Sequence, residues 1–177
     1  MTDRDESQTD APELAEIEQM FKEAKGPDAR THAYLMLGVL RERRGNWSAA
    51  VGSYSRALAE GSQHKFLCYF GNNNLGYSLV QLGRFDEAEG YCLAAIEIAP
   101  SWHNAHKNLG LVRQGQGRWL EAAFCFVEAY RICPDDPRAW HHLTALLDTE
   151  PTILVQSVEL RIRMAELSAE DQVIRGH

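Results

Sequence analysis

Asparagine recurs at a regular position in this sequence. The tripeptide Asn-Leu-Gly begins at Asn74 and begins again at Asn108. Asparagine is a poor helix former, and its side-chain amide both donates and accepts hydrogen bonds. Such an amide can pair with the C=O and N–H groups of an extended polypeptide. The recurrence therefore suggests that two asparagines hold another chain by its backbone, largely regardless of that chain's sequence.

Basic side chains accompany the second asparagine. Lys107 directly precedes Asn108, and Arg138 and the pair His141–His142 follow about one interval later. Lys107 and Arg138 would suit an acidic group of a ligand, although ordinary solvated charge is an equally open interpretation. A histidine such as His142 is only partly charged at neutral pH. These residues indicate a binding surface with a positive end.

Motifs for catalysis and metal binding do not emerge from the sequence. It contains no nucleophile elbow, zinc-protease motif, phosphate loop or dinucleotide-binding fingerprint. His103 and His106 are three residues apart, but no carboxylate or cysteine completes a ligand set at the usual spacing. Cys92 and Cys125 fall near the expected packing faces of helices, where they would serve as small hydrophobic residues. We therefore expect no metal, no cofactor and no enzymatic activity.

Composition narrows the class of protein. The 177 residues are 45% hydrophobic and 24% charged, with a net charge of −7. An acidic chain is a poor match for nucleic acid, and no apolar run is long enough to span a bilayer. The polar, acidic first ten residues do not resemble a secretion signal. We expect a cytoplasmic protein with reduced cysteines that binds neither nucleic acid nor membrane.

A repeat with the same interval as the asparagines positions them and the basic residues. This interval separates Gly76 from Gly110 and Gly110 from Thr144, whereas Gly38 precedes Gly76 by four residues more. A leucine precedes each of these positions. Seven residues after each of the three glycines comes another glycine, and two further on an aromatic residue. Alanines recur later in each unit, and a proline closes the second and third units, at 100 and 134.

This pattern resembles the tetratricopeptide repeat, a helix–turn–helix unit with Trp, Leu-Gly, Ala and Pro at fixed positions. The resemblance implies an all-α, right-handed superhelix, in which helix pairs stack because one pair cannot bury its apolar face alone. The sequence departs from the family pattern in two ways. The family's tryptophan at position 4 is Tyr34, Asn72 and His106 in the first three units, and Ser62 replaces the closing proline of the first.

The repeat predicts the boundaries of the elements. Three units are expected within 31–136, at residues 31–64, 69–102 and 103–136, with a partial fourth unit and a capping helix over 137–168. The four extra residues at 65–68 are expected to add about one helical turn.

The ends of the chain are expected to differ from the repeats. An N-terminal helix is expected within 12–30, after a disordered acidic segment at 1–11. The cap is expected as one helix over about 152–168, before a tail at 169–177. Its inward stripe is expected to consist of Val155, Val158, Ile162 and Ala165.

Positions 2, 5, 6 and 9 of each unit form one stripe of its first helix, which the resemblance places on the concave surface. This stripe predicts a peptide-binding groove that grades from apolar to basic. Its residues are Leu35, Met36, Val39, Phe70, Asn73, Asn74, Tyr77, Asn104, Lys107, Asn108, Leu111, Arg138, His141 and His142, with His32 and Ala145 at the two ends. The alternative is that the asparagines merely follow the repeat consensus.

The leading functional hypothesis is a protein-interaction module that binds an extended peptide of another protein. Some family members clamp a C-terminal carboxylate, and Asn108 and Arg138 match that clamp whereas Asn73 and Tyr77 do not. The apolar end of the groove leaves open a small chaperone of secreted or aggregation-prone clients. A third alternative is a self-associating scaffold. In it, the segment 1–30, with nine acidic and four basic residues, would fill the groove of a second copy.

Overall fold

The computed structural model describes residues 11–175, with side chains described for 13–168, so residues 1–10 of the expected disordered segment lie outside the described residues. The described chain is helical, without strands, which confirms the predicted all-α architecture. The helices are α1 Ala11–Glu23, α2 Pro27–Arg43, α3 Trp47–Ala59, α4 Lys65–Gln81, α5 Phe85–Ile98, α6 His103–Gly115, α7 Trp119–Ile132, α8 Arg138–Thr149, α9 Thr152–Gln156 and α10 Val158–Arg175. Among the described helices, none is both long enough and apolar enough to cross a bilayer.

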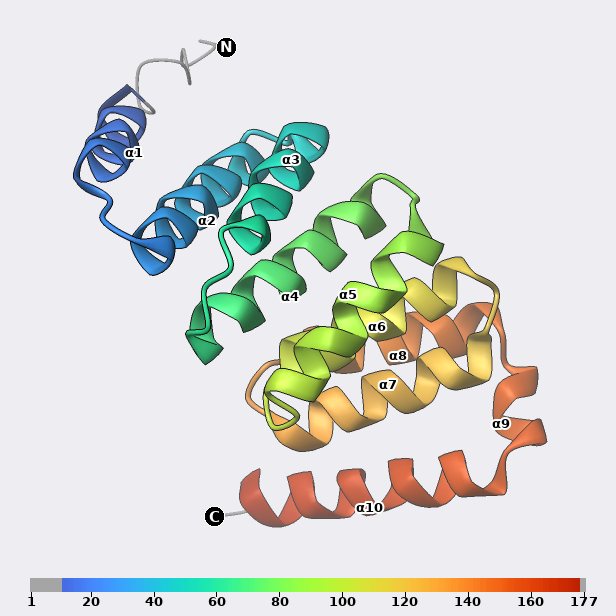
Figure 1. Cartoon of the computed structure of the whole chain (residues 1–177). Helices are drawn as coiled ribbons and strands as arrows, with labels where there is room; N and C mark the ends of the chain where they lie inside the picture. The colour runs from blue at the N-terminus through green and yellow to red at the C-terminus, as the bar shows by residue number, and fades with distance from the viewer. Residues whose placement is uncertain (1–10, 176–177) are drawn as a thin grey trace, which may run out of the picture.

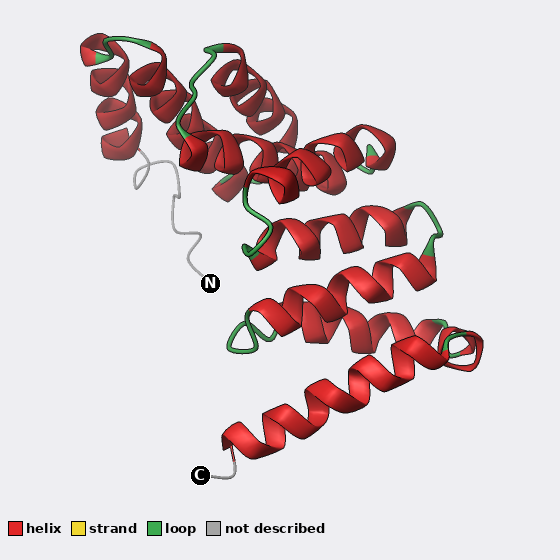
Figure 2. Ribbon diagram, turned by 60° about the horizontal axis from the view of Figure 1, so that its bottom comes forward, coloured by secondary structure: helices red, strands yellow, loops and turns green. Residues whose placement is uncertain are grey.

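Three helix pairs stack along the chain, α2 with α3, α4 with α5 and α6 with α7, and α8 packs against α7 (Figure 1). A tight turn joins the two helices of each pair, as the green loops in Figure 2 show. The turn glycines Gly45, Gly83 and Gly117 have φ values of 67°, 71° and 74°. Glycine adopts this left-handed conformation without a steric penalty. This explains why a glycine recurs seven residues after each of Gly38, Gly76 and Gly110, which we call the anchor glycines.

The anchor glycines let the two helices of a pair approach closely. A Cβ atom on Gly38 would lie 2.3 Å from the Tyr54 ring, one on Gly76 2.7 Å from the Cys92 sulfur, and one on Gly110 2.4 Å from the Phe126 ring. Tyr54, Cys92 and Phe126 occupy the same position in their units and are fully buried. The second helix thus places one side chain directly on the backbone of the first.

Replacing Gly110 by alanine is expected to destabilise the fold by about 1–3 kcal/mol, because the new methyl overlaps the buried ring of Phe126. Gly90→Ala is the matched control: a Cβ there meets nothing within 4 Å. That variant should be stabilised by about 0.5–1 kcal/mol through helix propensity. Urea unfolding followed by circular dichroism measures both. Equal midpoints for Gly110→Ala and wild type would contradict the close approach.

The four residues 65–68 lengthen a helix, since α4 begins at Lys65 and has 17 residues against 13 in α6. Helix α2 also has 17 residues.

The N-terminal region divides at Gly26–Pro27. Gly26 has φ 89°, and Pro27 opens α2 at a position where its missing N–H costs nothing. Helix α1 therefore ends at Glu23, and the first repeat helix starts before the expected residue 31.

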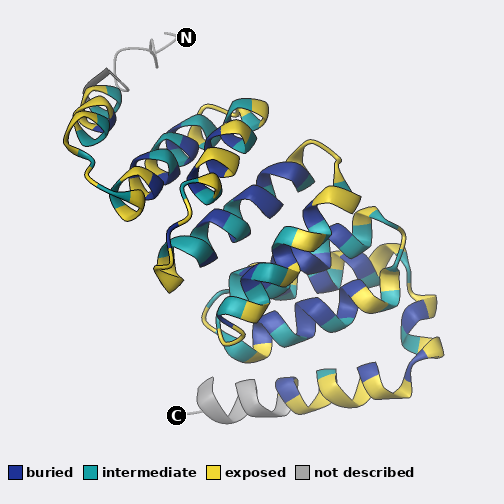
Figure 3. Cartoon of the chain, viewed as in Figure 1, coloured by how far each residue is buried: buried dark blue, intermediate teal, exposed yellow. Residues whose placement is uncertain are grey.

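The C-terminal region differs from the expected single helix. Ser157 is extended (φ −124°, ψ 106°) and separates α9 from α10, which continues to Arg175 beyond the expected end at 168. The break shifts the helical phase, so Ile153, Leu160 and Leu167 pack into the core beside α7. The expectation that this stripe faces inward is therefore wrong, because Val155, Val158, Ile162 and Ala165 are all exposed. Figure 3 shows how much of α10 is exposed.

Candidate functional site

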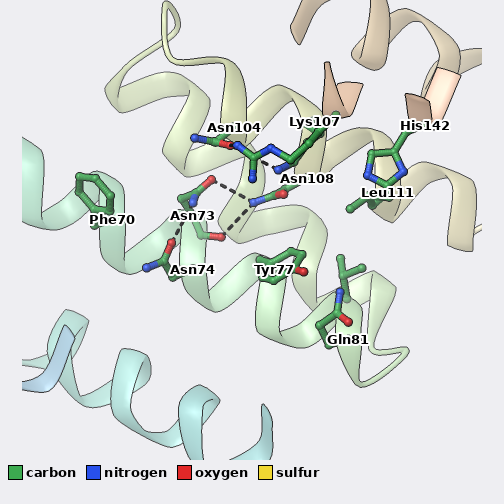
Figure 4. A pocket seen from close by; sticks show the side chains of 12 residues that line it. Phe70, Asn73, Asn74, Tyr77, Gln81, Asn104, Lys107, Asn108, Leu111 and His142 are labelled. Carbon is green, nitrogen blue, oxygen red and sulfur yellow. Dashed lines mark hydrogen bonds between the residues drawn. The ribbon is translucent and has the colours of Figure 1, made fainter. Parts of the chain in front are cut away.

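A pocket of about 450 Å³ lies across the first helices α4, α6 and α8 (Figure 4). It brings together ten residues of the predicted groove: Phe70, Asn73, Asn74, Tyr77, Asn104, Lys107, Asn108, Leu111, Arg138 and His142. Val80 and Gln81 also line it and were missed. They lie three and four residues after Tyr77, so extending the helical stripe by one more turn would have found them.

Six predicted groove residues lie elsewhere. The two at its ends, His32 and Ala145, are exposed and do not line this pocket. Leu35 is 6% exposed and belongs to the hydrophobic core, so the expectation that it faces the groove is wrong. Met36 and Val39 line a separate pocket with Ile17 and Met20 of α1. His141 is exposed and does not line the pocket across α4, α6 and α8.

Burial at position 5 of the repeat explains why Leu35 does not line the pocket and why Lys107 is buried in its wall. The residues at position 5 are Leu35, Asn73, Lys107 and His141, and the first three are 6%, 8% and 6% exposed. Each of these three faces the first helix of the next unit. The Leu35 side chain, for example, reaches to within 3.8 Å of where a Cβ of Gly71 would lie. Stacking therefore buries one edge of the concave stripe, except at His141 in the last first helix.

An amide network joins α4 to α6 in the floor of the pocket. The Asn108 amide nitrogen donates to the Asn73 side-chain oxygen at 3.0 Å and to the Asn73 backbone carbonyl at 3.4 Å. The Asn73 amide nitrogen in turn donates to the Asn74 side-chain oxygen at 2.9 Å (Figure 4). Asn74 and Asn108 both line the pocket, but Asn108 uses its donor groups within the protein rather than holding them free for a ligand.

One oxygen of this network is buried and unpaired within the described part of the chain. Asn108 is 2% exposed, and its side-chain oxygen Oδ1 has no hydrogen-bond partner among the described residues. A buried acceptor without a hydrogen-bond partner lowers the stability of the fold.

The positive end of the pocket centres on Lys107. Its ammonium group donates to the Asn104 side-chain oxygen at 3.3 Å and forms no ion pair with a described carboxylate. Burial, with a further contribution from the nearby Arg138 charge, lowers the pKa of Lys107 to about 8, against a smaller opposing effect of Asp136. Lys107 is thus a buried cation with no ion-pair partner among the described residues.

Arg138, by contrast, is already paired. Its guanidinium donates to Asp136 at 2.6 Å and to the Asn104 side-chain oxygen at 3.2 Å. This ion pair holds the pKa of Asp136 far below its usual range, and a 2.8 Å contact with His103 contributes in the same direction. Arg138 is therefore fixed at the pocket rim.

His142 completes the basic end. Its ring stacks on Phe126 with centroids 5.5 Å apart. Burial lowers the pKa of His142, and the charges of Lys107 and Arg138 add to this effect. The neutral form is therefore favoured at neutral pH, which leaves Lys107 as the unpaired charge in the pocket.

The other groups considered for chemistry are packed side chains. Cys92 is buried, and burial raises the pKa of its thiol to about 12. Cys125 is buried beside Arg113, whose guanidinium lies 3.4 Å from the sulfur. Within the described part of the chain, no group of three or more His, Cys, Asp or Glu residues is placed to hold a metal ion.

Stacked helix–turn–helix units with a pocket across their first helices define an all-helical superhelical repeat protein. The particular repeat is given by comparison with known families: tetratricopeptide repeat models match residues 33–65 and 71–101. The chain belongs to the tetratricopeptide repeat family.

Known proteins share this architecture. Human tetratricopeptide repeat protein 7B is 31% identical over 124 residues, which is 70% of this chain but only 14% of that protein. The second such domain of human RPAP3, solved with the HSP70 peptide SGPTIEEVD, is 22% identical with a TM-score of 0.61, covering 68% of this chain and 98% of that domain. The first such domain of Spaghetti (RPAP3), bound to the HSP90 peptide SRMEEVD, is 17% identical with a TM-score of 0.62, covering 70% and 95%. These two likenesses establish the fold.

Proposed function

We propose that this chain is a protein-interaction module that binds an extended, acidic segment of another protein in the pocket across α4, α6 and α8. The observation that carries the proposal is Lys107, a buried cation in the pocket wall with no carboxylate partner among the described residues. Keeping a charge buried and unpaired is unfavourable. A carboxylate on a bound segment would supply the missing partner.

The amide network supports an extended backbone as the ligand. The Asn108 side-chain oxygen is an unpaired acceptor buried beneath the surface of the pocket, so a peptide N–H would pair with it only after the side chains that cover it move. A chain that donates one N–H to Asn108 can place a neighbouring acidic side chain at Lys107, the adjacent residue of α6. Backbone and charge are then recognised together.

Two solved relatives of the same fold bind peptides of this kind. The RPAP3 peptides SGPTIEEVD and SRMEEVD both contain two consecutive glutamates and end in aspartate. At 22% and 17% identity this likeness does not transfer the ligand, but it supports an acidic segment as the ligand class.

The anion site proposed here is not the clamp known from some family members. Asn73, at one of the clamp positions, is buried and engaged by both neighbouring asparagines. Tyr77, at another, carries no positive charge. The proposed anion partner is Lys107, at position 5 of the third unit, so an internal acidic side chain would satisfy the site as well as a chain end.

Selection from a displayed library of random decapeptides tests the proposal. Immobilised wild-type protein is expected to enrich peptides rich in Asp and Glu, and the Lys107→Met variant is expected to lose that enrichment. Lys65→Met, at the exposed start of α4, is the matched control and should enrich as wild type does. Absence of acidic enrichment on wild type, or equal enrichment on Lys107→Met, contradicts the proposed function.

A further inference from the structure

Three aromatic side chains form an open surface beside the pocket, which we call the aromatic shelf: Phe66, Phe70 and Trp102. The ring of Phe66 lies 4.4 Å from that of Phe70 and 5.5 Å from that of Trp102, centroid to centroid. Phe66 is 50% exposed, whereas Phe70 and Trp102 are less exposed. Phe66 lies within the extra turn that residues 65–68 add to α4.

The shelf is continuous with the pocket. Phe66, Phe70, Asn73 and Tyr77 follow one another at steps of four, three and four residues, so they share one face of α4. The last three of them line the pocket. A segment bound in the pocket can therefore extend over the shelf without crossing another element.

Packing within the protein does not account for Phe66. Tyr69, which is 2% exposed, already fills the space beside Trp102, with ring centroids 4.3 Å apart. Tyr69 also belongs to a buried cluster with Ala95, Ala99 and Ala105. A half-exposed phenyl ring above this cluster adds little to the core, whereas a ligand side chain that covers it would bury apolar surface.

We propose that the aromatic shelf is a second subsite, which takes a bulky apolar side chain of the same acidic segment that pairs with Lys107. This inference rests on the proposed function and adds to it the order of acidic and apolar residues in the bound segment. The charge of Lys107 selects the occupant, because an acidic group held there brings the neighbouring residues of the same segment to the shelf.

The distance between the two subsites sets the spacing of the motif. Adjacent packed helices have axes about 8–10 Å apart. Phe70 and Lys107 lie on the neighbouring helices α4 and α6 and line one pocket. Asn73 is the equivalent of Lys107 in α4 and lies seven residues after Phe66, which adds an offset of about 10 Å along the helices. An extended chain spans about 3.3–3.6 Å per residue. The apolar residue should therefore lie about four positions from the acidic residue.

The same decapeptide selection tests the shelf separately from the charge site. On wild type, the enriched acidic peptides should share an aromatic or large aliphatic residue about four positions from an Asp or Glu. Phe66→Ser should keep the acidic enrichment and lose the apolar position. Ile162→Ser, which removes a 53%-exposed side chain on α10, is the matched control and should change neither.

Affinity gives the second readout. The most enriched wild-type peptide, synthesised with a fluorescent label, should bind Phe66→Ser about tenfold more weakly by anisotropy, a loss typical of an aromatic contact. It should bind Ile162→Ser as it binds wild type. Thermal unfolding of Phe66→Ser should match wild type, which separates lost contact from lost fold.

Four results would overturn the inference. Acidic peptides without a shared apolar position, or equal affinity for Phe66→Ser and wild type, would remove the shelf and leave the proposed function standing. Sedimentation velocity that shows dimers of wild type but not of Phe66→Ser would assign the shelf to a second copy of this chain. No acidic enrichment at all would remove both proposals together.

Discussion

Replacing Lys107 by methionine is expected to make the free protein more stable and to weaken its binding of acidic peptides. Methionine has a similar length and no charge, so the variant keeps the apolar packing of the side chain and removes a buried cation that has no ion-pair partner among the described residues. Exchanges of buried charge for apolar groups are often neutral or stabilising, by about 1–4 kcal/mol. We expect a gain at the lower end of that range.

Binding should move in the opposite direction. A hydrogen bond to a charged group contributes about 1.5–3 kcal/mol, so the selected acidic peptide should bind Lys107→Met about 10- to 100-fold more weakly. Thermal unfolding and fluorescence anisotropy at pH 7 measure the two effects, with Lys65→Met as the exposed control. A variant less stable than wild type would mean that Lys107 has an internal partner, and the argument for an anionic ligand would then fail.

The affinity for acidic peptides should fall as pH rises through the pKa of Lys107. In the free protein this pKa is about 8, lowered by burial and by Arg138. A bound carboxylate favours the charged form, so binding takes up a proton above this pH. Affinity should therefore fall about tenfold by pH 9 and about a hundredfold by pH 10, relative to pH 7, until the pKa of the complex is reached.

The other groups near Lys107 do not produce this profile. Arg138 stays charged, because Asp136 raises its pKa further. Asp136 stays ionised, and the pKa of His142 is lowered, so neither changes charge between pH 8 and 10. Anisotropy titrations across pH 7–10 measure the effect, and the residual binding of Lys107→Met should be flat. An unchanged wild-type affinity from pH 7 to pH 10 would contradict the role of Lys107.

The stability of the free protein should follow the opposite trend with pH. The folded pKa of Lys107, about 8, lies below the ordinary value of 10.5, so between these values the unfolded chain binds the extra proton. The cost of burying the charge is therefore complete below pH 8 and is relieved as pH rises towards 10.5. A difference between the stability profiles of wild type and Lys107→Met over this window isolates the contribution.

Local rules predicted the features that depend on one helix pair. The spacing of Gly38, Gly76 and Gly110 was sufficient to predict the close approach of the two helices in each pair, because each glycine meets a side chain at a fixed later position in the same unit. The turn glycines at 45, 83 and 117 followed equally, since a left-handed φ is a property of one residue. Most of the pocket lining could be placed for the same reason, from one stripe on each first helix.

Features that depend on neighbouring units were not predictable in this way. A helical wheel assigns Leu35 and Lys107 to the same concave stripe, but burial at position 5 comes from the next first helix, which the wheel does not contain. The break at Ser157 was also missed, because either of two apolar stripes after Pro151 could face inward. Only the packing on α7 decides between them.

Burial at position 5 also makes the number of repeats a determinant of charge. His141, at position 5 of the last first helix, is exposed, while Lys107 one unit earlier is buried by the helix that follows it. A further helix pair stacked after α8 would bury His141, as position 5 is buried in the three earlier units. The electrostatics of such a surface therefore depend on array length as well as on the residues that line it.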